Sequence, residues 1–443
     1  MLRIFLFFIL LFSCLNLLSQ NFCGHKGLPI SKKEMKEVIR LSRLGQTKAI
    51  GCRENNVYTV PVVIHIMHTG QAVGSNINIS DAQASSLISA LNRDFRSTHS
   101  ISQRGVAVDT RIDFCLAKQD PSGNPTSGIT RHNCSSVGNY ATRGVKVFTA
   151  GTGGVTPRSI ASRPGATWDV NKYLNIWVIN EIDNQGQNNV NSFSGGYLGF
   201  APLSPTAGTS PNTMWNTNIA DPDGGIMPGV AGCFIVASAC LGVETSAQAS
   251  AAGYFYWNQR LAYQGRVGTH EIGHYFGLPH TFSDFNPNVC SNGDGIGDTG
   301  NAKVVGNACS SGCGGQNGEN YMDYNNQTCI GEFTTGQRTV MRSRLSGGFS
   351  AMSQCNFCKA KYDLSIDNVT VNKNDCNLKF TGNIDVTNIG TQTLTNFKIR
   401  YRVNTGAWII YTWTGNLLSG SSTTINIPNI SGVNGANNFQ VEV

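Results

Sequence analysis

The chain has 443 residues, with 33 Lys and Arg residues against 26 Asp and Glu residues. Nine of the basic and two of the acidic residues lie in residues 1–53, so the whole formal charge of +7 belongs to the N-terminus and the rest is neutral. This distribution excludes the extended basic surface by which a protein attracts nucleic acid or an anionic membrane. The composition does not indicate an oligomeric state.

Residues 1–20 have the pattern of a secretory signal peptide. Arg3 precedes a run of Ile, Phe and Leu, and the segment ends in Leu-Ser-Gln. The apolar run is too short for a comfortable membrane span. A lipoprotein site at Cys14 is the alternative, although apolar residues continue beyond this cysteine. We therefore expect bacterial-type export to the extracellular space, without stable insertion into the membrane.

Residues 21–53 hold most of the basic charge and predict a prosegment. Ser31 and Glu34 form a capping-box pattern at the start of a short basic helix. A helix lying on a membrane surface is the alternative interpretation. Arg53 is the expected processing site, because the pattern of a globular domain begins immediately after it.

A globular domain is predicted over residues 54–358, and it begins with a β-α-β pattern. Residues 57–67, VYTVPVVIHIM, are apolar and β-branched and predict a central strand. Ser80 and Gln83 open a predicted helix with apolar residues at helical spacing. Further strands are expected at residues 111–117, 173–182 and 229–239.

Two histidines and one long loop in this domain are open to more than one interpretation. His65 and His68 lie in or beside the first strand, where a histidine is more often a hydrogen-bonded core or edge residue than a metal ligand. The strand at 173–182 alternates Leu174, Ile176 and Val178, as a strand beside a cleft does. Residues 183–229 are rich in Gly, Asn, Ser, Thr and Pro, and they form either a wall of a cleft or disordered surface.

Residues 268–282, GTHEIGHYFGLPHTF, have the spacing of a catalytic zinc site. His270 and His274 lie four residues apart, so a helix over 267–276 places both imidazoles on one face. Glu271 lies between them and can accept a proton from a metal-bound water. Gly277 can end the helix in a left-handed conformation and direct His280 to the same ion. Three imidazoles leave one zinc position open for water.

HEIGHYFGLPH matches the metzincin pattern H-E-x-x-H-x-x-G-x-x-H, and the wider segment resembles the pappalysin (cytophagalysin) family of zinc metalloendopeptidases. CSNGDGIGDT at 290–299 and NYMDY at 320–324 are similar to later segments of that family. The resemblance implies an α+β catalytic domain with an α/β upper subdomain. It also implies that Met322 forms an apolar floor beneath the metal and that Tyr324 acts near the zinc as a switchable ligand or oxyanion stabiliser.

The resemblance further implies structural calcium near residues 290–299. Asp294, Asp298 and Thr299 supply the hard oxygen atoms that calcium prefers. An Asp-Gly turn explains the same residues nearly as well.

The function expected from this site is hydrolysis of peptide bonds, with a zinc-activated water and Glu271 as general base. A zinc hydrolase of a non-peptide amide is one alternative. A secreted binding or adhesion protein with a vestigial metal site is another, although binding needs no general base. Arginine-preferring relatives carry an acidic residue five positions after the methionine of NYMDY, where this chain has Gln327, so we expect a neutral or broad specificity pocket.

The 14 cysteines suggest both latency and disulfide bonds. Cys23 is a candidate for a prosegment thiolate that occupies the open zinc position, and a Cys23–Cys52 disulfide is the alternative. Two disulfides are expected among the four cysteines that follow the zinc motif, with open pairing. These are Cys290, Cys309, Cys313 and Cys329. Cys115 with Cys134 and Cys233 with Cys240 are further expected pairs.

Residues 362–443 alternate apolar and polar side chains and predict an all-β sandwich of immunoglobulin-like type. Phe397, Ile399 and Tyr401 alternate with basic residues, and turn residues separate the predicted strands. The pattern is similar to adhesion-type modules that are appended to secreted bacterial enzymes. The sequence ends within a strand pattern, which is compatible with a domain that continues beyond residue 443.

Overall fold

The structure, a computed structural model, describes residues 53–443 apart from 55, 99–105, 147–153, 183–197, 202–231, 237–263, 285, 305–311, 314–317, 326, 354, 374–378 and 433–436. The chain divides into two compact units. The larger unit includes residues up to 116 and 127–355, and the smaller unit combines 117–126 with 356–443. Among the described residues, no helix combines the length and apolar character that crossing a membrane requires. The expected signal peptide, the expected prosegment up to residue 52, and Cys23 lie outside the described residues.

The larger unit is built on a mixed sheet with β2, Val57–His68, at its centre. Its described strands run in the order β1-β2-β5-β7-β6, with β3 and β4 pairing with successive parts of β2. All of these pairings are parallel except β1 with β2 and β6 with β7. The bounds are β1 Arg53–Glu54, β3 Ile112–Leu116, β4 Ile129–Asn133, β5 Leu174–Ile179, β6 Gly199–Phe200 and β7 Gly232–Val236.

The strands expected from the apolar runs are confirmed, but one of them is more deeply buried than its pattern suggested. All six residues of β5 are buried, whereas alternation beside a cleft predicts one exposed face. A parallel strand in the middle of a sheet is covered on both faces, so its polar residues must also be buried. Asn175 shows this, because its side chain hydrogen-bonds within the core.

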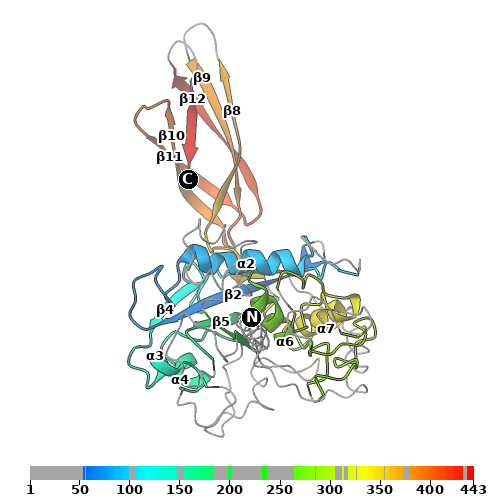
Figure 1. The fold of residues 1–443 in the computed structure, drawn as a ribbon. Coiled ribbons are helices and arrows are strands. Elements are labelled where there is room, and N and C mark those ends of the chain that lie inside the picture. Colours follow the sequence, from blue (N-terminus) through cyan, green and yellow to red (C-terminus); the bar gives the residue numbers. More distant parts are fainter. Residues whose placement is uncertain are drawn as a thin grey trace, which may run out of the picture. The chain divides into compact units, whose positions relative to one another are not determined.

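Two helices connect the sheet to the histidine motif (Figure 1). Helix α2, Asp81–Phe95, begins where Ser80 accepts a hydrogen bond from the backbone N–H of Gln83, as the sequence predicted. Helix α2 packs against β3 and against α6, Arg266–Tyr275, which carries the first two histidines of the motif. Helix α6 in turn packs on β7 and β6. The short helices α3, Tyr140–Arg143, and α4, Pro157–Ala161, precede β5.

Helix α7, Thr335–Ser346, has no counterpart among the elements expected from the sequence. Its amphipathic pattern is weak because four Thr and Ser residues and three Arg residues interrupt the apolar positions. Thr334 and Gln337 form a complete capping box at its start. This capping pair is the sequence signal that could have located the helix.

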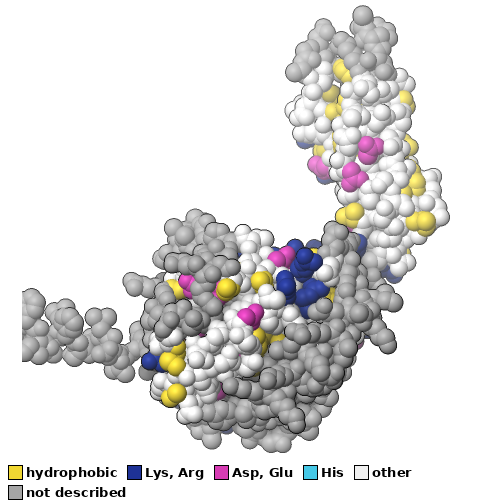
Figure 2. Space-filling model, turned by 90° about the vertical axis from the view of Figure 1, so that its right-hand side faces the viewer, with side chains coloured by type: hydrophobic (Ala, Val, Ile, Leu, Met, Phe, Trp, Pro, Cys, Tyr) yellow, Lys and Arg dark blue, Asp and Glu magenta, His cyan; other side chains and the backbone are white. Residues whose placement is uncertain are grey.

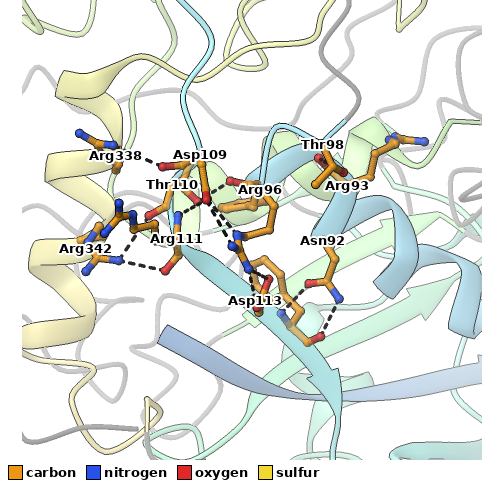
Figure 3. Close-up of polar contacts among 12 residues, drawn as sticks. Asn92, Arg93, Arg96, Thr98, Asp109, Thr110, Arg111, Asp113, Arg338 and Arg342 are labelled. Atoms are coloured by element: carbon orange, nitrogen blue, oxygen red, sulfur yellow. Dashed lines mark hydrogen bonds and ion pairs between the residues drawn. The ribbon is translucent and has the colours of Figure 1, made fainter. Parts of the chain in front are cut away.

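Arginines join α7 and α2 to the segment that leads into β3 (Figure 3). Arg96, the C-cap residue of α2, contacts the carboxylates of Asp109 and Asp113 at 2.9 and 2.8 Å, and Arg342 of α7 donates to the carbonyl of Arg111 at 2.9 Å. Figure 2 shows basic side chains gathered on one face with acidic side chains beside them. The contacts of Arg96 and Arg342 therefore connect elements of the larger unit.

The smaller unit is a β-sandwich, as predicted. One described sheet has the order β11-β10-β13 and the other the order β12-β9-β8, with antiparallel pairing throughout. Isoleucine and valine side chains from both sheets form a common core. The strands are β8 Leu364–Lys373, β9 Lys379–Asn388, β10 Leu394–Val403, β11 Ile409–Leu417, β12 Ser422–Ser431 and β13 Phe439–Glu442, preceded by the short helix η3 Cys355–Cys358.

Residues 117–126 belong to the smaller unit although they are distant from it in sequence. The backbone N–H of Lys118 donates to the carbonyl of Phe357 at 2.7 Å, and the Gln119 side chain donates to the carbonyl of Lys359 at 2.8 Å. The expected domain bounds of 54–358 and 362–443 stay predictions.

The disulfide expectations are partly confirmed. Cys290 and Cys313 form a disulfide after the histidine motif. The expected pairs of Cys115 with Cys134 and of Cys233 with Cys240 are wrong, because Cys134 and Cys233 are buried free thiols. Cys115 lies beside the first half of β2 and Cys134 follows its far end, which separates them by about 20 Å or more. Burial raises the pKa of the Cys134 thiol to about 11, so it stays protonated.

Candidate metal centre

Polar contacts from other elements fix the start of α6. The N-cap position is Gly265, which has no side chain to cap the helix, and the side-chain oxygen of Gln327 accepts from the backbone N–H of Arg266 at 3.0 Å instead. One turn later, the hydroxyl of Thr269 donates to the buried carboxylate of Asp94 on α2 at 2.7 Å. These contacts fix both the position of the helix and its rotation about its axis.

The turn after α6 has the conformation that the sequence predicted. Gly277 has a φ of 91°, the left-handed region in which glycine carries no steric penalty. A side chain at this position would also collide with the buried guanidinium of Arg344, whose Nε lies 2.5 Å from the Cβ position. The turn ends the helix, and the next residues direct His280 back toward it.

Three imidazoles converge at this point. The Nε2 atoms of His274 and His270 are 3.1 Å apart, those of His274 and His280 are 3.1 Å apart, and those of His270 and His280 are 3.3 Å apart. All three residues are fully buried. Tetrahedral zinc with Zn–N bonds of about 2.0–2.1 Å places its ligand nitrogens about 3.3–3.4 Å apart. The spacing of these three atoms fits that geometry within a few tenths of an ångström.

The outward nitrogens explain why the inward ones can act as ligands. Each Nδ1 lies 2.6 Å from an oxygen that can only accept a hydrogen bond from it, so each Nδ1 carries the proton. The acceptors are the carbonyls of Tyr321 and Leu278 and the carboxylate of Asp284. In the neutral imidazoles that bind metals, the three Nε2 lone pairs then face one another and repel. A cation between them removes this repulsion, so the donor set fits a metal ion.

Glu271 lies within α6 between the first two histidines and is fully buried. The short strand β6 passes very close to it. A Cβ atom added at Gly199 would lie 2.6 Å from both Cγ and Oε1 of Glu271, so only glycine fits at this position. Gly199 lies in the long segment that the sequence described as loop or disorder, and it brings the sheet edge to the carboxylate.

The structure also brings Met322 and Tyr324 to the histidines. The Sδ atom of Met322 lies 2.4 Å from the position of a Cβ at Gly273, so the methionine is packed directly against the helix turn between His270 and His274. The half-buried ring of Tyr324 has its centroid 4.7 Å from that of His280. Both residues lie close to the histidine motif, and their roles stay predictions.

The three candidate calcium ligands, Asp294, Asp298 and Thr299, have hydrogen-bond partners within the protein. Oδ1 of Asp294 accepts from the hydroxyl of Thr299 at 2.8 Å, whereas Asp298 accepts from Thr334 and from the backbone N–H of Gly336 at the start of α7. Burial raises the pKa of Asp294 to about 8. Calcium binding by these residues stays a prediction, and Asp298 also caps a helix.

His65 is fully buried in β2 and has a hydrogen-bond partner at each ring nitrogen. Its Nδ1 lies 2.7 Å from the hydroxyl of Thr130, its Nε2 lies 2.9 Å from Oδ1 of Asn175, and its ring stacks on Trp177. Burial lowers the pKa of His65 to about 3, so the ring is neutral. The interpretation of His65 as a satisfied core histidine agrees with this arrangement.

Sequence reasoning missed Asp94, Gly199 and Asp284. Asp94 and Gly199 lie far from the histidine motif in sequence, and no local pattern marks them. Asp284 had a weak local signal, because it is a carboxylate four residues after His280 in a loop that must pass near the metal site.

Residues 242–346 match the family model described as pregnancy-associated plasma protein-A. The resemblance to the pappalysins is confirmed over this segment. An extracellular metalloprotease of Neurospora crassa is 47% identical over 87 residues, which are 18% of this chain and 29% of that protein. One from Sordaria macrospora is 43% identical over 86 residues, again 18% of this chain and 29% of that protein. The chain thus covers less than a third of the length of these relatives.

Among solved structures, a promirolysin mutant of Tannerella forsythia is 24% identical, with a TM-score of 0.49. The match covers 75% of this chain and 97% of that one. Mature mirolysin of Tannerella forsythia in complex with a cleaved peptide is 27% identical over 68% of this chain and 96% of that one, with a TM-score of 0.44.

Proposed function

We propose that this chain is a secreted zinc-dependent endopeptidase. The observation that carries the proposal is the set of three buried Nε2 atoms, which face one another because acceptor oxygens hold the three Nδ1 protons outward. Export agrees with the N-terminal pattern and with the extracellular relatives that match the histidine motif.

His270, His274 and His280 would hold the zinc ion. When bound there, zinc would polarise the scissile carbonyl and lower the pKa of its water. Glu271 takes the proton of the attacking water and transfers it to the leaving amine. Tyr324 stands beside His280, where its hydroxyl can stabilise the developing oxyanion. No residue of the chain needs to form a covalent bond with the substrate.

The position of β6 favours a peptide over another amide. This strand is the last in the order of described strands, and its Gly199 lies against Glu271. An extended substrate that adds to such a sheet edge forms main-chain hydrogen bonds along its length and brings a peptide bond beside the general base. A small non-peptide amide would not use this edge.

The surroundings of Gln327 support a neutral specificity pocket. Its side chain is buried and caps α6 through the backbone N–H of Arg266. The Arg266 guanidinium also donates to the backbone carbonyl of Gln327. An uncharged residue already engaged in this way offers no carboxylate to an arginine side chain of a substrate.

The test is cleavage of denatured protein substrates by the chain before and after removal of residues 21–53. Glu271→Gln serves as the matched variant, and zinc content is measured on every sample. We expect the processed parent to cut and Glu271→Gln to keep zinc while its rate falls by about 10²–10⁴-fold. Equal zinc in both without any cleavage would favour the non-peptide amide hydrolase or the binding protein, and a parent that takes up no zinc would refute the proposal.

A further inference from the structure

The three histidines have unequal outward partners. Nδ1 of His270 and of His274 each meet a backbone carbonyl, whereas Nδ1 of His280 lies 2.6 Å from a carboxylate oxygen of Asp284. A hydrogen bond with one charged partner is shorter and roughly twice as strong as a bond between neutral groups. His280 therefore has the strongest of the three outward hydrogen bonds.

His280 is also the histidine with the least support from regular structure. The other two lie on α6, which ends at Tyr275, whereas His280 lies in the loop that follows. Its ring stacks on Phe282 with centroids 4.7 Å apart, which restricts the ring plane but not which nitrogen faces inward. Asp284 determines which nitrogen faces inward, because a carboxylate beside Nδ1 requires the proton on that nitrogen.

Asp284 cannot itself be a fourth ligand of the same ion. Its carboxylate contacts the Nδ1 edge of the imidazole, and the metal-facing atom is Nε2 on the opposite side of that ring. The cluster of ligand atoms that could share one ion contains only the three histidines among the described residues. The Asp284 side chain is 18% exposed and that of His280 is 0% exposed, so the carboxylate lies between the buried ring and solvent.

We propose that Asp284 is a positioning residue of the metal centre, one that fixes the tautomer of His280 and makes its Nε2 the most electron-rich of the three. This inference rests on the proposed zinc site. A carboxylate behind a ligating imidazole raises its basicity and fixes its orientation, and loss of such a partner weakens metal binding by about 10–100-fold.

Zinc affinity of the full chain, measured by competition with a chromogenic chelator, tests the proposal. Asp284→Ala removes the contact, and Asp284→Asn keeps an acceptor oxygen but removes the charge. We expect about 10–100-fold weaker binding for Asp284→Ala and a smaller loss for Asp284→Asn. Asp169→Asn is the matched control, because Asp169 pairs with Lys172 at the surface. Affinities of both Asp284 variants within about twofold of the parent would overturn the proposal.

The tautomer of His280 gives a second readout that needs no enzymatic activity. In the metal-free parent, nitrogen NMR of the histidine rings should show the His280 proton on Nδ1, and in Asp284→Ala it should be shared between both nitrogens. A parent proton on Nε2 would overturn the proposal directly. A parent that binds no zinc would refute the proposed function itself, a result distinct from equal affinities in parent and variants.

Discussion

Among the described residues of the larger unit, the buried histidines are of two kinds, which differ in what their ring nitrogens meet. One is the single residue His65, and the other is the metal set, His270, His274 and His280. His65 has complementary partners on both sides: Nε2 donates to Oδ1 of Asn175, and Nδ1 accepts from Thr130. The orientation of Asn175 follows from its NH₂ group, which donates to two backbone carbonyls. In the metal set, the outer nitrogens meet acceptor oxygens, and the inner ones face each other.

The comparison shows that burial alone does not identify a ligand. His65, His270, His274 and His280 are all fully buried. A histidine whose two nitrogens both have complementary protein partners gains nothing from an ion, whereas a cation stabilises three acceptor nitrogens that converge on one point. The arrangement of partners therefore separates a structural histidine from a metal ligand.

The largest expected effect comes from replacing a histidine of the metal set with alanine, compared with the same replacement at His65. His274→Ala should lose its zinc, and peptide hydrolysis should fall by about 10³-fold or more, since both the polarised carbonyl and the activated water depend on the ion. His65→Ala should keep one zinc per chain. Metal analysis and a peptide assay on the two purified variants measure this difference. Zinc loss in His65→Ala with a native circular dichroism spectrum would break the distinction.

Replacing Asp94 should affect the metal set and not His65. Its buried carboxylate binds Thr269, which precedes His270, and hydrogen-bonds Tyr321, whose carbonyl holds His270 Nδ1. Asp94→Ala should cost about 3–5 kcal/mol of unfolding free energy, because it leaves the buried guanidinium of Arg266, whose Nε lies 3.9 Å from the Asp94 carboxylate, without a counter-charge. It should also weaken zinc binding. Urea unfolding of the metal-free protein and chelator competition measure the two effects.

The matched control for Asp94→Ala is Asp113→Ala. Asp113 also pairs with an arginine, Arg96, but its side chain is 31% exposed. A partly exposed ion pair contributes about 1 kcal/mol or less. Equal losses of stability in the two variants would contradict the view that Asp94 is a buried link between α2 and the metal helix.

The sequence was sufficient to predict the local parts of the metal centre. His270, Glu271, His274 and His280 lie within eleven residues, and the spacing of a helix followed by a glycine turn determines how they meet. The central strand and α2 were also predictable, because apolar periodicity and a capping serine mark them. These features depend on neighbours in sequence.

The missed features depend on contacts across the fold. Asp94 meets Thr269 across 175 positions of sequence, and Gly199 meets Glu271 only because β6 pairs with β7 next to α6. The wrong pairing of Cys115 with Cys134 has the same origin, since the register of β3 and β4 along β2 decides their separation. No local pattern encodes that register.

The structural histidine should produce a measurable pH dependence. The folded-state pKa of His65 is about 3, against 6.5 for the free side chain, so the unfolded chain binds the proton first. Stability is therefore complete above about pH 6.5 and declines as the pH falls toward 3. Between about pH 7.5 and 5, His65 alone should reduce the unfolding free energy by about 2 kcal/mol.

Urea unfolding of the parent and of His65→Ala at both pH values, with chelator present, isolates this contribution. The difference in pH dependence between the two proteins belongs to His65, because other histidines titrate in both. Identical slopes would mean that the ring is charged in the folded state, contrary to its two complementary hydrogen bonds.

The smallest expected effect concerns the cap that Gln327 supplies to α6. Removing an N-cap acceptor costs about 1 kcal/mol, so Gln327→Ala and Ser80→Ala should lose similar amounts of unfolding free energy. Ser80 caps α2, which bears no metal ligand, whereas Gln327 caps the helix that carries His270 and His274.

Fraying of α6 competes with metal binding, and about 1 kcal/mol corresponds to about fivefold in affinity. Chelator competition should therefore show weaker zinc binding only in Gln327→Ala, and equal affinities would mean that the histidines hold their geometry without the cap.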